Sequence, residues 1–226
     1  MRIILSGGGS GEETVELDKL FADMLDKSKP LLYIPIAIDN IKHPYPECLT
    51  WLKKTFNNLG VKKYEMWSEE ELFKFEDSSP KQFSGIYLGG GNTFYLLKKL
   101  KDNKGIGFIR EAIIQDIPIY GGSAGAIIFS KSIKTSLNFD KNWVDLEDFE
   151  GINLIRDHYL WCHFEENKLD KIKNLILNQK IAPSIALTEK NGLFLCEGEI
   201  CLVGTEPAWV FDKVGNRKKL EPGKKV

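Results

Sequence analysis

The chain has 226 residues, of which 42% are hydrophobic and 28% are charged, the balance of an ordinary globular protein with a buried core. The formal net charge of −1 gives no basis for binding a polyanion, so neither nucleic acid nor an acidic membrane surface is an expected partner. No apolar run approaches the roughly 20 residues that span a bilayer, and residues 1–5 read as a first core strand. We therefore expect a cytoplasmic protein that forms one domain over residues 1–226.

Short apolar runs alternate with amphipathic segments in the first half of the chain. The expected strands are 3–5, 31–36, 61–67, 84–88 and 117–120, and the expected helices are 12–26, 44–59, 93–100 and 107–115. This alternation predicts an α/β fold, a three-layer αβα sandwich with a mostly parallel central sheet.

The pattern changes after Lys131, where residues 132–162 mix short β-prone runs with acidic loops. Beyond them the expected elements are a strand at 159–162, a helix at 165–178, a strand at 184–187, a C-terminal β-hairpin made of 192–196 and 199–203, and a strand at 209–211. Residues 213–226 form a basic tail that we expect to be loose.

The run Ile117–Lys131 contains a Gly-x-Ser-x-Gly frame, in which Gly121 and Gly125 flank Ser123. An apolar run on each side predicts a strand, a sharp turn and a helix, with the serine at the tip of the turn. Such a turn strains its central residue and directs the hydroxyl out of the sheet. Ser123 is therefore a candidate nucleophile, and a phosphate-binding or functionless turn is the alternative.

A second glycine-rich segment, Gly7–Gly11, follows the first expected strand. It lacks the lysine and hydroxyl residue that end a phosphate-binding loop, and it lacks dinucleotide-binding spacing. The acidic Glu12 and Glu13 that follow it would also repel an anion. We do not expect a phosphate site here.

A serine nucleophile needs an imidazole as base and an acid that orients the imidazole. Of the three histidines, His43 precedes Pro44 in a loop after the second expected strand, His158 stands before the strand at 159–162, and His163 stands directly after that strand in a strand-end loop, which makes it the candidate base. The orienting acid stays open from the residues alone; the candidates are Asp140, Asp145, Asp157, Glu165 and Glu189. Glu189 also lies at an expected strand end.

The backbone N–H groups of Gly91 and Ala124 are candidates for an oxyanion hole, because each follows a strand that ends near the expected nucleophile. No histidine and carboxylate set has metal-ligand spacing, so we expect neither a metal nor a cofactor. The cysteines at 48, 162, 196 and 201 form no CxxC pair and are expected to be free thiols.

The segments GGGNTF at 89–94 and GGSAGA at 121–126, followed by His163-Phe164, together resemble the dipeptidase E and cyanophycinase family of serine peptidases. The order of elements is similar from the first strand to residues 209–211. The resemblance implies a fold like that of the class I glutamine amidotransferases, with serine in place of cysteine. It implies Ser123 as nucleophile, His163 as general base and Gly91 and Ala124 as oxyanion donors, with Glu189 where a glutamate completes the triad in some members.

Family members that cleave after an N-terminal aspartate carry arginines soon after the histidine, whereas this chain has Lys168, Lys171 and Lys173 there. A lysine can pair with a substrate carboxylate as a point charge. Asn92 and Lys168 are therefore the candidate substrate-binding residues. The expected function is hydrolysis of small peptides, with N-terminal aspartate as a candidate preference, by a monomer or homodimer.

Two other functions fit the same residues. The first is an esterase or amidase that acts on a non-peptide acyl compound, since the same machinery serves both reactions. The second is a catalytically silent protein of this fold that binds a small ligand.

Overall fold

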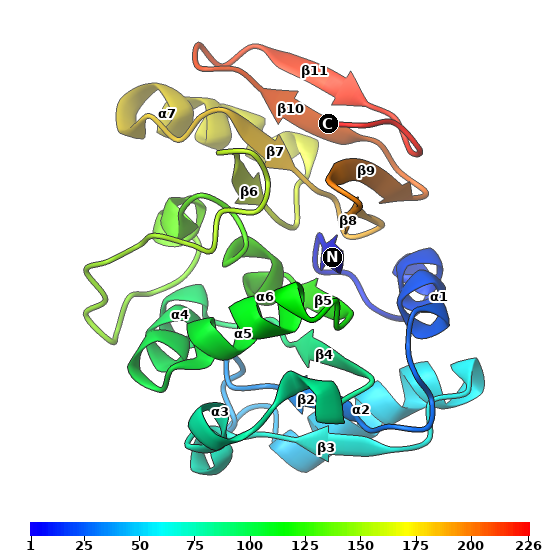
Figure 1. Cartoon of the computed structure of the whole chain (residues 1–226). Coiled ribbons are helices and arrows are strands. Elements are labelled where there is room, and N and C mark those ends of the chain that lie inside the picture. The colour runs from blue at the N-terminus through cyan, green and yellow to red at the C-terminus, as the bar shows by residue number, and fades with distance from the viewer.

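Two β-sheets make up the framework in the computed structural model, which describes residues 1–226. The central sheet has seven strands in the order β3-β2-β4-β5-β1-β8-β9, and the second has four in the order β11-β10-β7-β6. Figure 1 shows the smaller sheet at the end of the molecule where β8 and β9 lie.

The central sheet is parallel over its first five strands in sequence and antiparallel beyond them. Its strands are β1 (Arg2–Ser6), β2 (Leu31–Ile34), β3 (Tyr64–Met66), β4 (Gly85–Leu88), β5 (Ile119–Gly122), β8 (Asn191–Cys196) and β9 (Glu199–Gly204). β8 pairs antiparallel with β1, and β9 pairs antiparallel with β8. The predicted hairpin is thus confirmed, and it extends the central sheet at one edge.

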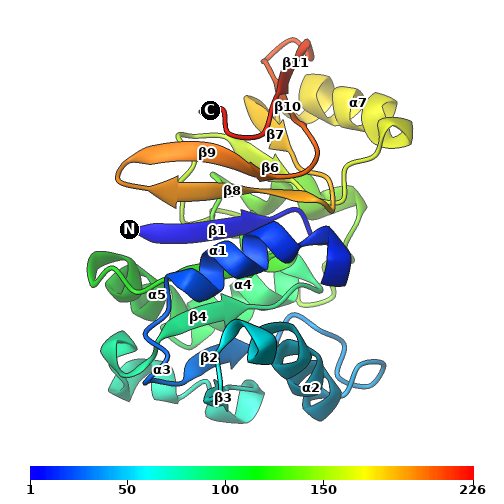
Figure 2. The same ribbon diagram turned by 90° about the vertical axis from the view of Figure 1, so that its right-hand side faces the viewer.

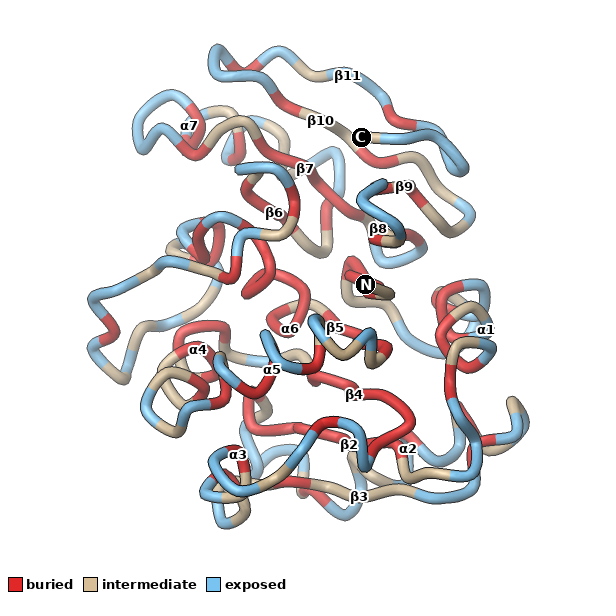
Figure 3. The backbone as a smooth tube through the Cα atoms, in the orientation of Figure 1, coloured by how far each residue is buried: buried red, intermediate tan, exposed pale blue.

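Helices cover both faces of the central sheet, which confirms the three-layer arrangement predicted from the sequence. The helices are α1 (Val15–Asp23), α2 (Tyr45–Phe56), α3 (Lys74–Asp77), α4 (Thr93–Asp102), α5 (Gly105–Ile114), α6 (Ala124–Ile127) and α7 (Leu169–Gln179). Figure 2 shows α1 and α2 in front of the sheet, and Figure 1 shows α3 to α6 on the opposite side. The strands β2, β4 and β5 are buried along their whole length (Figure 3), because helices exclude water from both of their faces.

The sequence does not predict a separate second sheet. Its strands are β6 (Tyr159–Trp161), β7 (Ser184–Ala186), β10 (Ala208–Phe211) and β11 (Arg217–Leu220). β6 and β7 are parallel, and β10 pairs antiparallel with both β7 and β11. Helix α7 buries Ile172 and Ile176 in a cluster with Tyr159 and Trp161, so this sheet has its own small apolar core.

The prediction of a loose tail at 213–226 is wrong. Residues 217–220 form β11, which supplies backbone hydrogen bonds to the open edge of β10. Farther on, the N–H of Leu202 donates to the carbonyl of Lys224 and the N–H of Val226 donates to that of Ile200, each at 2.9 Å. Backbone pairing of this kind does not depend on side-chain type, so a basic segment can still be ordered.

Residues 132–158 form no extended strand, although an isolated bridge joins Ser132 to Glu150. Short 3₁₀ helices occur at Gly11–Glu13, Asn57–Leu59, Glu69–Glu71, Pro80–Gln82, Ile133–Asn138 and Glu166–Lys168. Two of them replace the first turns of the helices expected at 12–26 and 165–178. None of the helices has the length and the apolar character that crossing a membrane would require.

Candidate active site

Ser123 occupies the strained turn that the sequence predicts between β5 and α6. Its backbone has φ 49° and ψ −110°, a conformation that L-residues rarely adopt. The flanking glycines are needed because a Cβ at Gly121 would lie 2.3 Å from the carbonyl oxygen of Gly125, and one at Gly125 would lie 2.4 Å from that of Leu88. The N–H of Ser123 donates to the carbonyl of Ser6 at 3.2 Å, which ties the turn to the end of β1.

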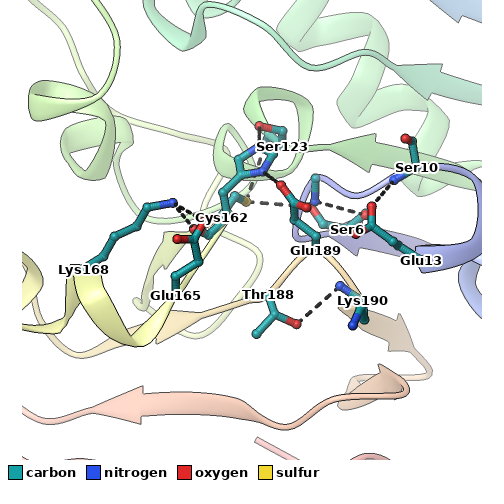
Figure 4. Close-up of polar contacts among 12 residues, drawn as sticks. Ser6, Ser10, Glu13, Ser123, Cys162, Glu165, Lys168, Thr188, Glu189 and Lys190 are labelled. Atoms are coloured by element: carbon teal, nitrogen blue, oxygen red, sulfur yellow. Dashed lines mark hydrogen bonds and ion pairs between the residues drawn. The ribbon is translucent and has the colours of Figure 1, made fainter.

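The side chains of Ser123, His163 and Glu189 form a chain of hydrogen bonds. Ser123 Oγ lies 2.9 Å from His163 Nε2, and His163 Nδ1 lies 2.8 Å from Glu189 Oε1. Figure 4 shows the Glu189 carboxylate pointing toward Ser123. The His163 and Glu189 side chains are 41% and 46% exposed, so a substrate can reach them from solvent.

These residues come from different sheets. Ser123 follows β5 of the central sheet, whereas His163 follows β6 and Glu189 follows β7 of the second sheet. The backbone N–H of His163 donates to the carbonyl of Gly7 at 2.8 Å, which joins the two sheets directly beneath the imidazole.

Glu189 is the carboxylate that contacts His163, and the other candidate acids have different partners. Asp140 Oδ2 accepts hydrogen bonds from the N–H and hydroxyl of Thr93 at 2.8 and 2.6 Å. Glu165 accepts from Asn167 and Lys168, and these contacts hold the pKa of its carboxyl below the usual value. Asp157 accepts from Asn153. Asp145 makes no side-chain hydrogen bond to His163.

The glycine-rich loop after β1 lies against the loops that carry the imidazole and the carboxylate. A Cβ at Gly7 would lie 1.9 Å from the carbonyl oxygen of Thr188, and one at Gly9 would lie 2.1 Å from that of Glu189. At Gly8 a Cβ would lie 2.3 Å from Cε1 of His163. Glycine is therefore required at these positions because the backbone of Thr188 and Glu189 and the imidazole of His163 pack directly against the loop. The sequence did not predict this structural role.

Gly91 and Ala124 both lie close to the nucleophile. Gly91 has φ +133°, and a Cβ there would lie 2.0 Å from the carbonyl oxygen of Ala37. A Cβ at the neighbouring Gly90 would lie 3.1 Å from Cβ of Ser123, so the loop after β4 passes beside the serine. Ala124 is the first residue of α6, where an N–H group has no partner within the helix.

The predicted substrate-binding residues have structural partners. Asn92 caps α4, because its Oδ1 accepts from the N–H of Tyr95 at 2.9 Å, and its Nδ2 donates to the carbonyl of Lys141 at 2.8 Å. The ammonium of Lys168 donates to the carbonyl of His163 at 2.6 Å and to Glu165 at 3.2 Å. Both contacts hold loops of the site in place.

A cavity of about 90 Å³ lies beside Ser123 and His163. Its walls include Thr135, Ser136 and Trp161, and each of these residues carries a buried polar side-chain atom without a hydrogen-bond partner. Cys162 also lines the cavity, and burial raises the pKa of its thiol far above the usual value. No motif in the sequence marks Thr135 or Ser136, since isolated hydroxyl residues carry no pattern.

A larger open groove of about 1230 Å³ lies on the other side of the loop after β4. Gly91 borders both the groove and the small cavity. The far wall of the groove is formed by aromatic and acidic residues from α2, the segment after β3, and α4. The site thus has two compartments of very different size, one on each side of Gly91.

Comparison with known proteins identifies the family to which this chain is similar. The model of peptidase family S51 matches residues 3–203. Peptidase E of Nostoc sp. (strain PCC 7120) is 28% identical over 200 residues, which cover 84% of this chain and 78% of the relative. Peptidase E of Shewanella sp. (strain W3-18-1) is 31% identical over 139 residues, and this match spans only 58% of each protein.

Solved structures show the same fold. A crystal structure assigned to peptidase E from Listeria monocytogenes EGD-e has a TM-score of 0.69 at 22% identity and covers 91% of this chain and 98% of its own. The crystal structure of a peptidase from an acI-B1 Actinobacterium has a TM-score of 0.66 at 21% identity. The match covers 100% of this chain and 96% of the Actinobacterium chain. The expected fold class, like that of the class I glutamine amidotransferases, is thus confirmed. Because the family model matches most of the chain, this protein belongs to peptidase family S51.

Proposed function

We propose that this protein is a serine peptidase that hydrolyses small peptides through an acyl-enzyme at Ser123. The observation that carries the proposal is the chain of hydrogen bonds from Ser123 Oγ to His163 Nε2 at 2.9 Å and from His163 Nδ1 to Glu189 Oε1 at 2.8 Å. A serine hydroxyl becomes a nucleophile when an oriented imidazole can accept its proton.

In the first step His163 Nε2 accepts the proton of Ser123 as Oγ attacks the scissile carbonyl. Glu189 holds the imidazole in the tautomer with Nδ1 protonated and stabilises the positive charge that forms on the ring. His163 then gives the proton to the leaving amine. In the second half of the reaction His163 accepts a proton from water as the water oxygen attacks the acyl-enzyme carbonyl. His163 then returns that proton to Ser123 Oγ as the acid product leaves.

The negative charge on the tetrahedral intermediate needs hydrogen-bond donors that are already in place. We assign this role to the N–H groups of Gly91 and Ala124. The Ser123 N–H is not available, because it donates to Ser6. The positive φ of Gly91 supports this assignment, since the close contact with Ala37 fixes the loop beside the nucleophile.

The cavity of about 90 Å³ is the proposed site of the side chain on the acyl side of the scissile bond. Its volume equals that of about three water molecules, so it fits a small side chain and excludes an aromatic one. The hydroxyls of Thr135 and Ser136 and the indole N–H of Trp161 lie unpartnered in the walls of this cavity, and we propose that these side chains shift on substrate binding so that they donate to a carboxylate. Leaving such groups unpaired costs about 1–3 kcal/mol each, so an acidic side chain that accepts from them is favoured.

Asp140 supports recognition of a free amino terminus. It lines the same cavity, and Thr93 occupies only its Oδ2 oxygen. Its Oδ1 can therefore accept from the ammonium group of an N-terminal residue. Together these features favour peptides that begin with aspartate, cleaved after that residue.

The test is hydrolysis of a dipeptide panel in which Asp, Glu, Asn, Ala and Phe precede a constant leucine. We expect Asp-Leu to have the highest kcat/KM and N-acetyl-Asp-Leu to react poorly. A fluorophosphonate should label the wild type and leave Ser123→Ala unlabelled. Equal kcat/KM for Asp-Leu and Ala-Leu would remove the aspartate preference, and turnover by Ser123→Ala would remove the mechanism.

A further inference from the structure

The groove on the far side of Gly91 contains a carboxylate without a cationic partner. Glu69 is partly buried in the groove wall. Its Oε1 and Oε2 accept from the hydroxyl of Tyr45 at 2.6 and 2.7 Å, and Oε1 also accepts from the hydroxyl of Tyr95 at 3.3 Å. No lysine, arginine or histidine nitrogen lies within 4.0 Å of it.

The tyrosine hydroxyls are neutral donors that hold this carboxylate in a fixed position. Burial, followed by the contact with Glu69, raises the pKa of Tyr45 well above its usual value, so its hydroxyl stays protonated. Two neutral donors replace only part of the hydration that a carboxylate loses on burial. A cation would form a stronger, charge-assisted hydrogen bond with it.

The surroundings of Glu69 also suit a cation. The ring of Trp143 stacks on that of Tyr95 at 4.7 Å and is 55% exposed, which leaves indole surface open to the groove. Aromatic faces attract cations. Lys99 already lies 5.2 Å from the centre of the Tyr95 ring, but its ammonium forms no ion pair with Glu69.

The remaining charges of the groove do not neutralise this carboxylate. Asp39 pairs with Lys42 at 3.6 Å. Glu47 lines the groove without an ion-pair partner, and His43 is the other titratable base there. The groove thus keeps two unpaired carboxylates, and its field attracts a positive group.

The position of the groove relates it to the leaving group of the reaction. Gly8 borders the groove and packs on the His163 imidazole, and Gly90 borders it and packs on Ser123. The leaving amine must receive its proton from His163, so it departs on the side where imidazole and groove meet. The volume of about 1230 Å³ accommodates a long side chain and further residues.

We propose that this groove binds the residue after the scissile bond and prefers a basic side chain, lysine or arginine, whose cation pairs with Glu69 and lies against Trp143. The proposal rests on the proposed function, because it takes the small cavity as the acyl side. It makes Glu69 a specificity-determining residue that leaves the chemistry at Ser123 unchanged.

The test compares Asp-Lys and Asp-Arg with Asp-norleucine, which has a similar chain length but no charge. We expect kcat/KM for the basic dipeptides to be about 10-fold higher, a ratio that Glu69→Gln reduces to about one. Aspartyl p-nitroanilide places an uncharged leaving group in the groove, so the ratio of its kcat/KM to that of Asp-norleucine should be the same in wild type and Glu69→Gln. Glu47→Gln is the matched control, with most of the basic preference retained.

Equal kcat/KM for Asp-Lys and Asp-norleucine in the wild type would overturn the proposal, as would a basic preference that survives Glu69→Gln. If the wild type cleaves none of the substrates, the proposed function has failed instead. Calorimetric binding of the same dipeptides to Ser123→Ala then decides: tighter binding of Asp-Lys that depends on Glu69 supports the groove assignment, and equal binding overturns it. Thermal unfolding of each variant confirms that it is folded.

Discussion

Gly8 and the imidazole of His163 are packed so closely that a Cβ at position 8 would lie 2.3 Å from Cε1 and 2.4 Å from Nε2 of the ring. The glycine loop and Glu189 therefore hold the imidazole between them, and Nε2 is directed at Ser123 Oγ. An imidazole fixed in this way loses little freedom when the reaction begins.

Replacement of Gly8 by alanine should therefore displace the imidazole. We expect kcat to fall about 100-fold or more, because a small misplacement of a catalytic group is costly. Gly11→Ala is the matched control: Gly11 also has a positive φ, +61°, but a Cβ there would meet nothing within 4 Å. Both variants should lose some stability in thermal unfolding, while only Gly8→Ala loses activity; equal activity losses would contradict this account.

Glu189→Gln should keep the shape of the side chain and lose its charge. Without the carboxylate the imidazole is neither held in the correct tautomer nor stabilised when charged, and we expect kcat to fall about 10²- to 10⁴-fold. Glu165→Gln is the control, because Glu165 lies close to His163 in sequence and bonds to Asn167 and Lys168 instead. Should Glu165→Gln lose activity and Glu189→Gln keep it, the acid has been assigned to the wrong residue.

Trp161→Phe should separate stability from substrate binding. The indole N–H of Trp161 is buried without a partner, so losing it offsets, by about 1–3 kcal/mol, part of the cost of the cavity that the smaller ring leaves in the apolar cluster. The same change removes a donor from the small cavity, and KM for aspartyl substrates should rise about 10-fold. Ser184→Ala removes another buried, unpartnered hydroxyl outside the cavity and should leave KM unchanged. Denaturant titration and steady-state kinetics measure the two effects, and an unchanged KM in Trp161→Phe would exclude Trp161 from substrate binding.

Asp18 should make the stability of the fold depend on pH. Burial raises the pKa of its carboxyl from 3.8 to about 6, although the hydroxyl of Thr14 donates to it at 2.8 Å and opposes the rise. Between these two pKa values the unfolded state has lost its proton and the folded state keeps it, so stability falls as pH rises from about 4 to about 6. The shift corresponds to about 3 kcal/mol.

Asp18→Asn has no proton to lose at this position. The wild type should therefore lose stability relative to this variant as pH rises. The difference in their free energies of unfolding, measured by denaturant titration from pH 4 to 7, should change by up to about 3 kcal/mol in favour of Asp18→Asn. A difference between the two proteins that stays constant across this pH range would show that Asp18 is ionised in the folded state.

The parts of the site that follow strong local patterns could be predicted from the sequence. The Gly-x-Ser-x-Gly frame places Ser123 in its turn because the steric demand on the neighbouring glycines is local. His163 could be chosen because it follows an apolar run, and Glu189 because it follows another. The choice of Glu189 over the other acids depended on the resemblance to a known family, since a carboxylate carries no local pattern that reveals its partner.

The rest of the site depends on contacts between distant segments. The glycines at 7–9 are explained by their approach to Thr188, Glu189 and His163, none of which is near them in sequence. The second sheet was not predicted because β6, α7 and β7 alternate as strand, helix and strand, the same pattern that the central sheet shows. This pattern does not reveal that the strands belong to a separate sheet. The strand β11 has the sequence Arg-Lys-Lys-Leu, and it pairs because the edge of β10 needs backbone partners.

The division of the triad between two sheets has a mechanical consequence. Ser123 is anchored to one sheet and His163 to the other, so a relative displacement of the two sheets by about an ångström would break the serine–imidazole contact and leave the ladders of both sheets intact. The seam between the sheets is narrow at this point: the thiol of Cys162 lies 3.7 Å from the carbonyl oxygens of both Ser6 and Ser123. A packing change at Cys162 should therefore lower kcat more than it lowers the free energy of unfolding.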